Sequence, residues 1–201
     1  MVLPGGMTKG LLAYAANPNL IRRAITYHTQ QANQRDAWYL RPGMNGVLWG
    51  TDFAATTGPF ISPEMFREFC LPSIKERVHN AKSRAYRVFK HACGNNWKLL
   101  EMFVEAGYDA YQSIQASASM DLKEVKRLYG DKLLLWSGAC VEHLMSGKPS
   151  DVREGVITAI TVGSPGGGFI LGTTHSIAVG TRYDNFMALL DTYLDIAHTS
   201  L

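Results

Sequence analysis

The feature that most constrains this chain is a repeated alternation of short apolar runs with longer helical stretches. Brief apolar runs bounded by glycine or polar residues are typical of buried strands, and they cover residues 46–50, 86–91, 110–114, 133–136 and 168–172. Strands that alternate with helices predict right-handed crossovers and a parallel sheet. Five such units fit either an open, doubly wound α/β sheet or part of a barrel, because a closed (β/α)8 barrel needs eight.

The helix after the first strand has the clearest start. Ser62 is predicted to be its N-cap, Pro63 occupies the first helical position, and Glu64 lies in the first turn, near the positive end of the helix dipole. We expect this helix to reach residues 82–84, with a kink or break at Pro72. Further helices are expected over residues 97–106, 121–129, 149–162 and 184–197, the first of them ended by Gly107.

Composition narrows the function classes. Hydrophobic residues make up 46% and charged residues 18% of the chain, as in an ordinary globular protein, and we expect one domain over residues 1–201. The net charge is only +3 and the basic residues are scattered, so no basic patch indicates nucleic-acid binding. No apolar run is long enough to predict a membrane span, and residues 1–10 lack the pattern of a signal peptide. Three cysteines without framework spacing favour reduced thiols and a cytoplasmic location.

Polar side chains that can carry chemistry follow successive predicted strands. The carboxyl ends of parallel strands meet at one edge of a sheet, where function gathers in such folds. The residues found there are Asp52 after the first strand, His91 and Cys93 after the second, Gln112 and Gln115 after the third, Ser137 and Cys140 after the fourth, and His175 after the fifth.

His91 and Cys93 are the strongest candidates for a metal site. Residues two apart in an extended segment point to the same side, so an imidazole and a thiolate can converge on one ion, and Zn²⁺ accepts this pair. A structural alternative remains for each residue. Cys93 can be a small buried side chain beside a hydrogen-bonded His91, Asp52 can cap a loop, and His175 can be an ordinary loop histidine.

From residue 46 to residue 197 the sequence resembles the C-terminal part of the uroporphyrinogen decarboxylase superfamily. The segments that carry the resemblance are GTDFAATTGPFISPEMFREFCLPSIKE, VFKHACGNNWKLLEMFVEAGYDAYQSIQ and GGGFILGTTHSI, with DNFMALL after them. They occur in the order found in the family. The resemblance implies a (β/α)8 barrel of the TIM type, of which this chain would supply about five C-terminal β/α units.

Within the superfamily the resemblance favours the corrinoid-dependent methyltransferases. Those enzymes hold Zn²⁺ with a His-x-Cys pair, here His91 and Cys93, and with a later residue that here is His175. The later residue is usually a cysteine in the methyltransferases, whereas histidine at this position is typical of the decarboxylases. The segment LLWSGACVEHL also replaces a stretch that decarboxylases have, and their N-terminal arginine-rich motif is absent.

The resemblance therefore implies a zinc-dependent methyltransferase that moves a methyl group between a corrinoid and a thiol or folate acceptor. Asp52 and His175 would be catalytic, and Gln112 and Gln115 would bind the cofactor. The corrinoid would be carried by a separate small protein, and the substrate would be a small molecule. Two alternatives remain, which are cofactor-independent decarboxylation of uroporphyrinogen in porphyrin biosynthesis and an inactive half-barrel.

Five β/α units leave the first strand at a sheet edge. Unpaired backbone groups along such a strand must be satisfied. We expect the segment 17–37 or a second copy of the chain, in a homodimer, to cover this edge, or else a preceding part of a longer chain.

Overall fold

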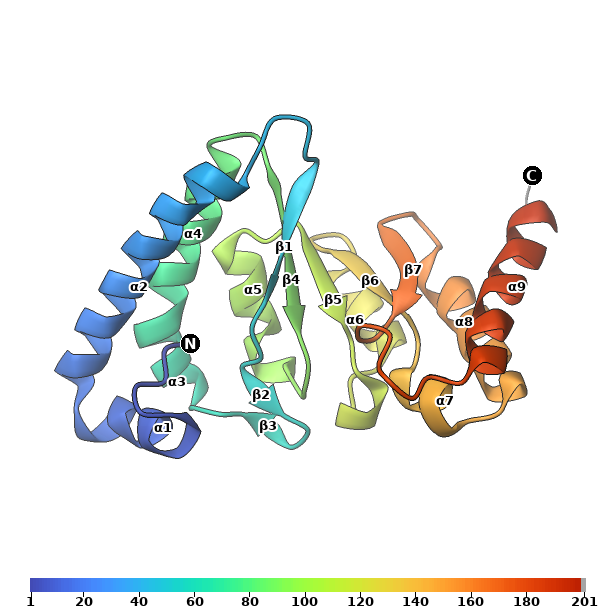
Figure 1. Ribbon diagram of the computed structural model, residues 1–201, viewed down its shortest axis with the longest axis horizontal. Helices are drawn as coiled ribbons and strands as arrows, with labels where there is room; N and C mark the ends of the chain where they lie inside the picture. The colour runs from blue at the N-terminus through green and yellow to red at the C-terminus, as the bar shows by residue number, and fades with distance from the viewer. Residues whose placement is uncertain (200–201) are drawn as a thin grey trace. The chain divides into compact units, whose positions relative to one another are not determined.

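The computed structural model describes residues 1–199, which form two compact units (Figure 1). The first unit is Met1–Asp109 and the second begins at Ala110. The single domain expected over residues 1–201 stays a prediction.

The first unit combines a helical layer with a short parallel strand pair. Its elements, in chain order, are α1 (Met7–Ala16), α2 (Pro18–Tyr39), β1 (Gly46–Gly50), the hairpin of β2 (Ala54–Ala55) and β3 (Gly58–Pro59), α3 (Pro63–Met65), a π-helical turn (Phe66–Cys70), α4 (Leu71–Lys82), β4 (Arg87–Ala92), a 3₁₀ turn (Trp97–Leu99) and α5 (Leu100–Ala106). Helices α2 and α4 lie side by side in Figure 1.

The helix that starts at Ser62 begins as the sequence predicts. The Ser62 side chain accepts a hydrogen bond from the Met65 backbone N–H at 3.2 Å, and Pro63 occupies the first helical position. The expected kink takes the form of the π-helical turn, which ends just before Pro72. Proline lacks an N–H and its ring displaces the carbonyl of residue i−4, so a locally wider turn is a physical consequence of Pro72.

The strand pair of the first unit is parallel, as predicted. Gly46 of β1 pairs with Arg87 of β4, and the register continues to Gly50 and His91. Along β4 the side chains alternate between buried and half-buried after the exposed Arg87. Successive residues of a strand face opposite sides, so Val88, Lys90 and Ala92 share one face of β4 while His91 belongs to the other.

An aromatic cluster fills the core of the first unit. The ring centroids of Phe53 and Phe66 are 5.0 Å apart, and Phe103 lies 6.1 Å from Phe53 and 6.5 Å from Phe66, with edge-on or tilted geometry. Such arrangements are favourable because the positive ring edge meets a negative face. The cluster fixes the chain directly after β1, which carries Asp52.

The second unit is built from β/α units. Its elements are β5 (Ala110–Ser113), a 3₁₀ turn (Ala116–Ala118), α6 (Leu122–Tyr129), β6 (Leu134–Ala139), α7 (Val141–Ser146), α8 (Pro149–Gly163), β7 (Phe169–Thr173) and α9 (Tyr183–Thr199). Strands β5, β6 and β7 are neighbours and parallel. Helix α8 packs on β6, with α9 alongside it (Figure 1). A buried apolar cluster on these elements contains Ala139, Leu144, Val152, Val156, Ala188 and Leu189.

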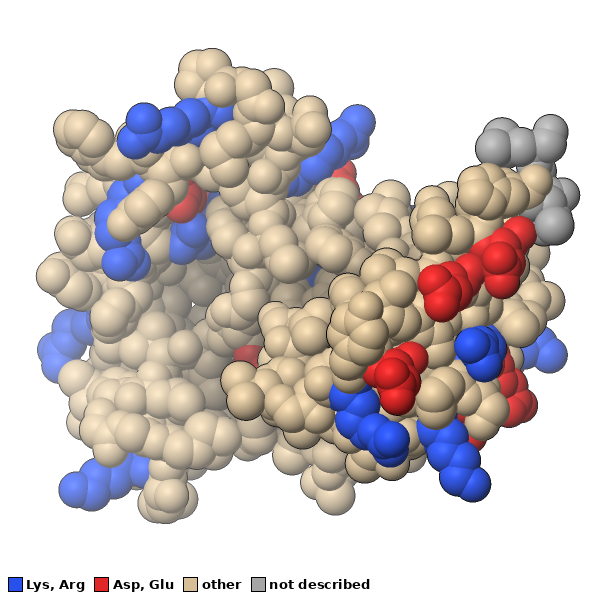
Figure 2. Space-filling view, turned by 45° about the vertical axis from the view of Figure 1, so that its right-hand side comes forward, with Lys and Arg blue, Asp and Glu red and all other residues tan. Residues whose placement is uncertain are grey.

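The first strand of the chain remains partly uncovered. Helix α2, which contains the segment expected to cover it, packs along α4, and Leu48 of β1 keeps 46% of its surface exposed. Within the described residues no helix has both the length and the apolar character needed to cross a membrane. Figure 2 shows basic and acidic side chains intermixed over the second unit, on the face turned toward the viewer.

Candidate metal site

The end of β4 brings two metal-competent atoms into contact. His91 is on the strand, Cys93 follows it, and the His91 Nε2 atom lies 3.5 Å from the Cys93 Sγ atom. Both side chains are half-buried. A tetrahedral zinc ion with a Zn–S distance of about 2.3 Å and a Zn–N distance of about 2.0–2.1 Å places its sulfur and nitrogen ligands about 3.5–3.6 Å apart. The spacing of this donor pair therefore fits one zinc ion.

Gly94 shapes the turn after Cys93. Its φ of +84° lies in the left-handed region, and a Cβ atom there would stand 2.3 Å from the Ala54 carbonyl oxygen. Only glycine permits this close approach of two backbones. The next residue, Asn95, donates its backbone N–H to the Ala55 carbonyl at 2.8 Å, so the turn is held against β2.

The side chain of Asn96 holds the same turn through hydrogen bonds. Its side chain is fully buried, and its Nδ2 atom donates to the carbonyl oxygens of Ala92, Cys93 and Gly94 at 3.2, 2.9 and 3.1 Å. Buried hydrogen-bonded side chains of this kind orient a ligand loop before a metal arrives. Sequence reasoning did not single out Asn96. Its position directly after His-x-Cys-Gly-Asn was the available signal.

Asp52 reaches the candidate site from the end of β1. Its Oδ1 atom accepts the Cys93 backbone N–H at 2.8 Å and lies 3.9 Å from His91 Nε2, while about half of the Asp52 side chain is exposed. A carboxylate in this position orients the cysteine and faces the histidine.

Lys90 is a further unusual residue of this region that sequence reasoning missed. Only 1% of its surface is exposed, its Nζ atom donates to the Thr51 carbonyl at 2.6 Å, and it lies 4.2 Å from the centre of the Phe53 ring. Burial lowers the pKa of Lys90 to about 7, although Asp52 and Cys93 act in the opposite direction. A lysine inside a strand that reads Val-Phe-Lys-His gives no sequence signal of burial, since lysines are normally exposed.

His175 lies in the second unit, in the loop after β7. Its side chain is exposed, and its carbonyl accepts a hydrogen bond from the Thr173 hydroxyl. Thr174 is buried and its hydroxyl oxygen accepts the Val141 backbone N–H at 3.1 Å, which ties this loop to the start of α7. Gln112 of β5 is buried and donates from Nε2 to the Thr173 carbonyl at 3.0 Å. The backbone that carries His175 is thus held in place.

Gln115 belongs to a polar cluster around Glu142 of α7. Glu142 accepts hydrogen bonds from the Cys140 thiol and the Ser117 hydroxyl, both at 2.7 Å, and from the Gln115 amide at 3.4 Å. Partial burial opposes ionisation of Glu142, but these hydrogen bonds outweigh it and hold its pKa at about 2. Burial raises the pKa of Cys140, which acts here as a hydrogen-bond donor.

The structure therefore brings three of the predicted site residues, Asp52, His91 and Cys93, together within the first unit. The other predicted site residues belong to the second unit: Gln112 lies in β5, Gln115 follows β5 and His175 follows β7.

Comparison with known protein families shows which family this chain belongs to. Residues 7–195 match the model of a family described as uroporphyrinogen decarboxylase. The chain belongs to the uroporphyrinogen decarboxylase family. A solved structure described as a methyltransferase from Methanosarcina mazei is similar, with a TM-score of 0.75 and 16% sequence identity over 94% of this chain. No curated protein matches the chain.

Membership of the uroporphyrinogen decarboxylase family decides the fold class. The expected α/β fold of the (β/α)8-barrel type is confirmed, and the parallel strands with their helices form part of such a barrel. The chain covers 53% of the M. mazei methyltransferase, so it spans about half the length of that structure.

Proposed function

We propose that this chain carries the metal site of a zinc-dependent methyltransferase, which moves a methyl group between a corrinoid and a thiol or folate acceptor. The observation that carries the proposal is the separation of 3.5 Å between His91 Nε2 and Cys93 Sγ. This distance suits two ligands of one tetrahedral zinc ion. The likeness to a methyltransferase structure supports the same branch of the family.

The proposed zinc ligands are His91, Cys93 and His175. The first two form the organised pair in the first unit, and His175 would add the third donor from the loop after β7. Three protein ligands leave a position open for an acceptor molecule, which is the pattern of catalytic zinc sites. Bound there, zinc would lower the pKa of an acceptor thiol and hold it as a thiolate.

The surrounding residues have orienting roles in this proposal. Asp52 fixes the Cys93 backbone through its Oδ1 atom and faces His91, so it can act as a general base or as a partner that orients the ligands. Asn96 keeps the carbonyl groups of the ligand turn in place. Gln112 and Gln115, near the ends of β5, would contact the cofactor, which a separate corrinoid protein would deliver.

Metal analysis tests the proposal. Protein purified without chelator should contain close to one zinc ion per chain, and Cys93→Ala should lose most of it because two remaining ligands hold the ion poorly. Cys70→Ala is the matched control, since Cys70 is only 2% exposed and packs near the Tyr14 hydroxyl. This control should keep its zinc.

The outcomes separate the candidate functions. Zinc in the wild type but equal loss in both cysteine variants would mean that the variants unfold, which circular dichroism would show. Absence of zinc from the wild type would overturn the proposal and favour metal-free decarboxylation of an acidic tetrapyrrole. Transfer of a methyl group from methylcobalamin to a small thiol, followed by the absorbance change of the corrinoid, tests the reaction itself.

A further inference from the structure

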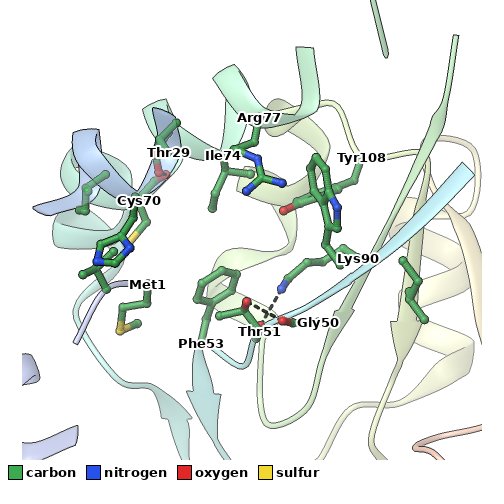
Figure 3. A pocket seen from close by; sticks show the side chains of 16 residues that line it. Met1, Thr29, Gly50, Thr51, Phe53, Cys70, Ile74, Arg77, Lys90 and Tyr108 are labelled. Atoms are coloured by element: carbon green, nitrogen blue, oxygen red, sulfur yellow. Dashed lines mark hydrogen bonds between the residues drawn. The ribbon is translucent and has the colours of Figure 1, made fainter. Parts of the chain in front are cut away.

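The first unit contains a cavity of about 340 Å³ that the metal site does not use (Figure 3). Strand β1, helix α4 and strand β4 contribute residues to it. Lys90 of β4 points into the cavity, whereas the neighbouring His91 lies on the opposite face of the strand, because side chains alternate along β4. The cavity and the His91–Cys93 pair are therefore separate features.

Two cationic side chains meet this cavity with unused hydrogen-bond donors. Lys90 has three N–H donors and, in the part of the chain that the structure describes, one hydrogen-bond partner, the Thr51 carbonyl at 2.6 Å. Arg77 of α4 donates from its NH2 group to both oxygens of Asp36, at 2.9 and 3.2 Å, but its buried Nε atom has no hydrogen-bond partner among residues 1–199. Buried donors without partners are costly, so a ligand that accepts from the Lys90 ammonium group would be stabilised.

The charged side chains of the cavity favour a negatively charged ligand. The sixteen residues that line the cavity include Lys90 and Arg77 but no aspartate or glutamate. Asp36 neutralises one side of the Arg77 guanidinium, whereas no carboxylate forms an ion pair with Lys90 in the described residues. Within the described residues Lys90 thus has no direct ion-pair partner, although Asp52 and Cys93 act on it electrostatically.

The remaining walls of the cavity mix aromatic and apolar side chains with the polar residues His28, Thr29, Thr51 and Ser73. Phe53 lies beneath Lys90 with its ring centre 4.2 Å from the Nζ atom, and Trp49 lies 4.5 Å from the Arg77 guanidinium carbon. Ile74 and Tyr108 add to the wall in Figure 3. A cavity that combines aromatic walls with a few convergent polar groups is typical of small-molecule sites.

We propose that this cavity binds a small organic acid whose carboxylate contacts Lys90 and Arg77. Its apolar body packs against Trp49 and Phe53. The carboxylate supplies acceptors for the remaining Lys90 N–H donors, and the volume of about 340 Å³ is large enough to admit benzoate. The site is distinct from the proposed zinc site, because it uses the other face of β4.

Benzoate and benzyl alcohol are a matched pair of probes for this site, because they share an aromatic ring and differ in the negative charge. Titration calorimetry or ligand-observed NMR should show saturable binding of benzoate and at least tenfold weaker binding of benzyl alcohol. Lys90→Met should weaken benzoate binding about tenfold or more, as expected for loss of a hydrogen bond to a charged group. The exposed Lys98 is the control, and Lys98→Met should bind benzoate like the wild type.

A second variant removes the space instead of the charge. Ile74→Phe adds volume to the wall from α4 and should abolish benzoate binding while Lys90 and Arg77 remain. Circular dichroism and thermal unfolding verify that each variant is folded. Equal binding of both probes, unchanged binding by folded Lys90→Met, or no benzoate binding at millimolar concentration would each overturn the proposal.

Discussion

Asn96 in the first unit and Asn185 in the second unit form the same local structure. Both side chains are fully buried, and each donates from Nδ2 to three backbone carbonyl groups. Asn96 holds the turn after β4, and Asn185 of α9 holds the carbonyls of His143, Leu144 and Gly147 at the end of α7. In each case one side-chain amide supplies hydrogen bonds to the backbone carbonyl groups of a turn or a helix end.

The two asparagines differ in what the held backbone carries. The turn fixed by Asn96 contains Cys93, whose thiol contacts His91. The segment fixed by Asn185 is a helix end, and its role is to join α7 to α9. A buried asparagine therefore does not mark a functional site by itself. The side chains on the loop that it holds decide whether the arrangement serves chemistry or only packing.

The first prediction uses this likeness and has the largest expected effect. Asn96→Ala and Asn185→Ala should each lower the free energy of unfolding by about 2–4 kcal/mol, because each leaves three buried carbonyls without this donor. Urea unfolding followed by circular dichroism measures both. Asn95→Ala is the control, since Asn95 is half-buried and its side chain accepts one long hydrogen bond of 3.4 Å from Trp97. A cost from Asn95→Ala as large as that from Asn96→Ala would contradict the role assigned to the Asn96 amide.

The second prediction uses the difference between the two asparagines, which is that only the turn held by Asn96 carries a proposed zinc ligand. Asn96→Ala should weaken zinc binding by about 10–100-fold, the usual cost of losing a group that orients ligands. Asn185→Ala should leave zinc affinity within about twofold of the wild type. Competition with a chromophoric chelator, under conditions in which both variants are folded, gives the two affinities. Equal weakening by both variants would mean that zinc binding reports general stability, and the comparison would fail.

The sequence predicted the regular elements of both units well because their signals are local. The five predicted strands appear with ends shifted by a residue or a few, and Ser62 caps its helix as expected. Gly107 ends α5 in the left-handed conformation, with a φ of +86°. Apolar runs, N-caps and C-terminal glycines act over a few residues, so one sequence is enough to locate them.

The parts that were missed depend on contacts across the chain. Nothing near Lys90 in the sequence shows that it will be buried against Thr51, which is 39 residues away. The three acceptors of the Asn185 amide lie 38–42 residues before it, so its role cannot be read from its neighbours. His91 and Cys93 could be predicted as a pair because a strand places alternate residues on one side, whereas the contact of Asp52 with the Cys93 N–H needed the fold.

The third prediction concerns the start of α7, the helix whose end Asn185 holds, and its expected effect is the smallest. Hydrogen bonds hold the pKa of Glu142 at about 2 in the folded protein, below its ordinary value of 4.5. Its stabilising contribution is therefore present above pH 4.5 and is lost as the pH falls toward 2. Glu142→Gln should cost under about 1 kcal/mol at pH 7, because the side chain is half-exposed, and the difference from wild type should vanish near pH 2. Urea unfolding between pH 7 and pH 2 measures this difference, with Glu154→Gln on the exposed face of α8 as the control. A cost that stays constant with pH would show that the Glu142 hydrogen bonds do not depend on its charge, and that Asn185 alone secures α7.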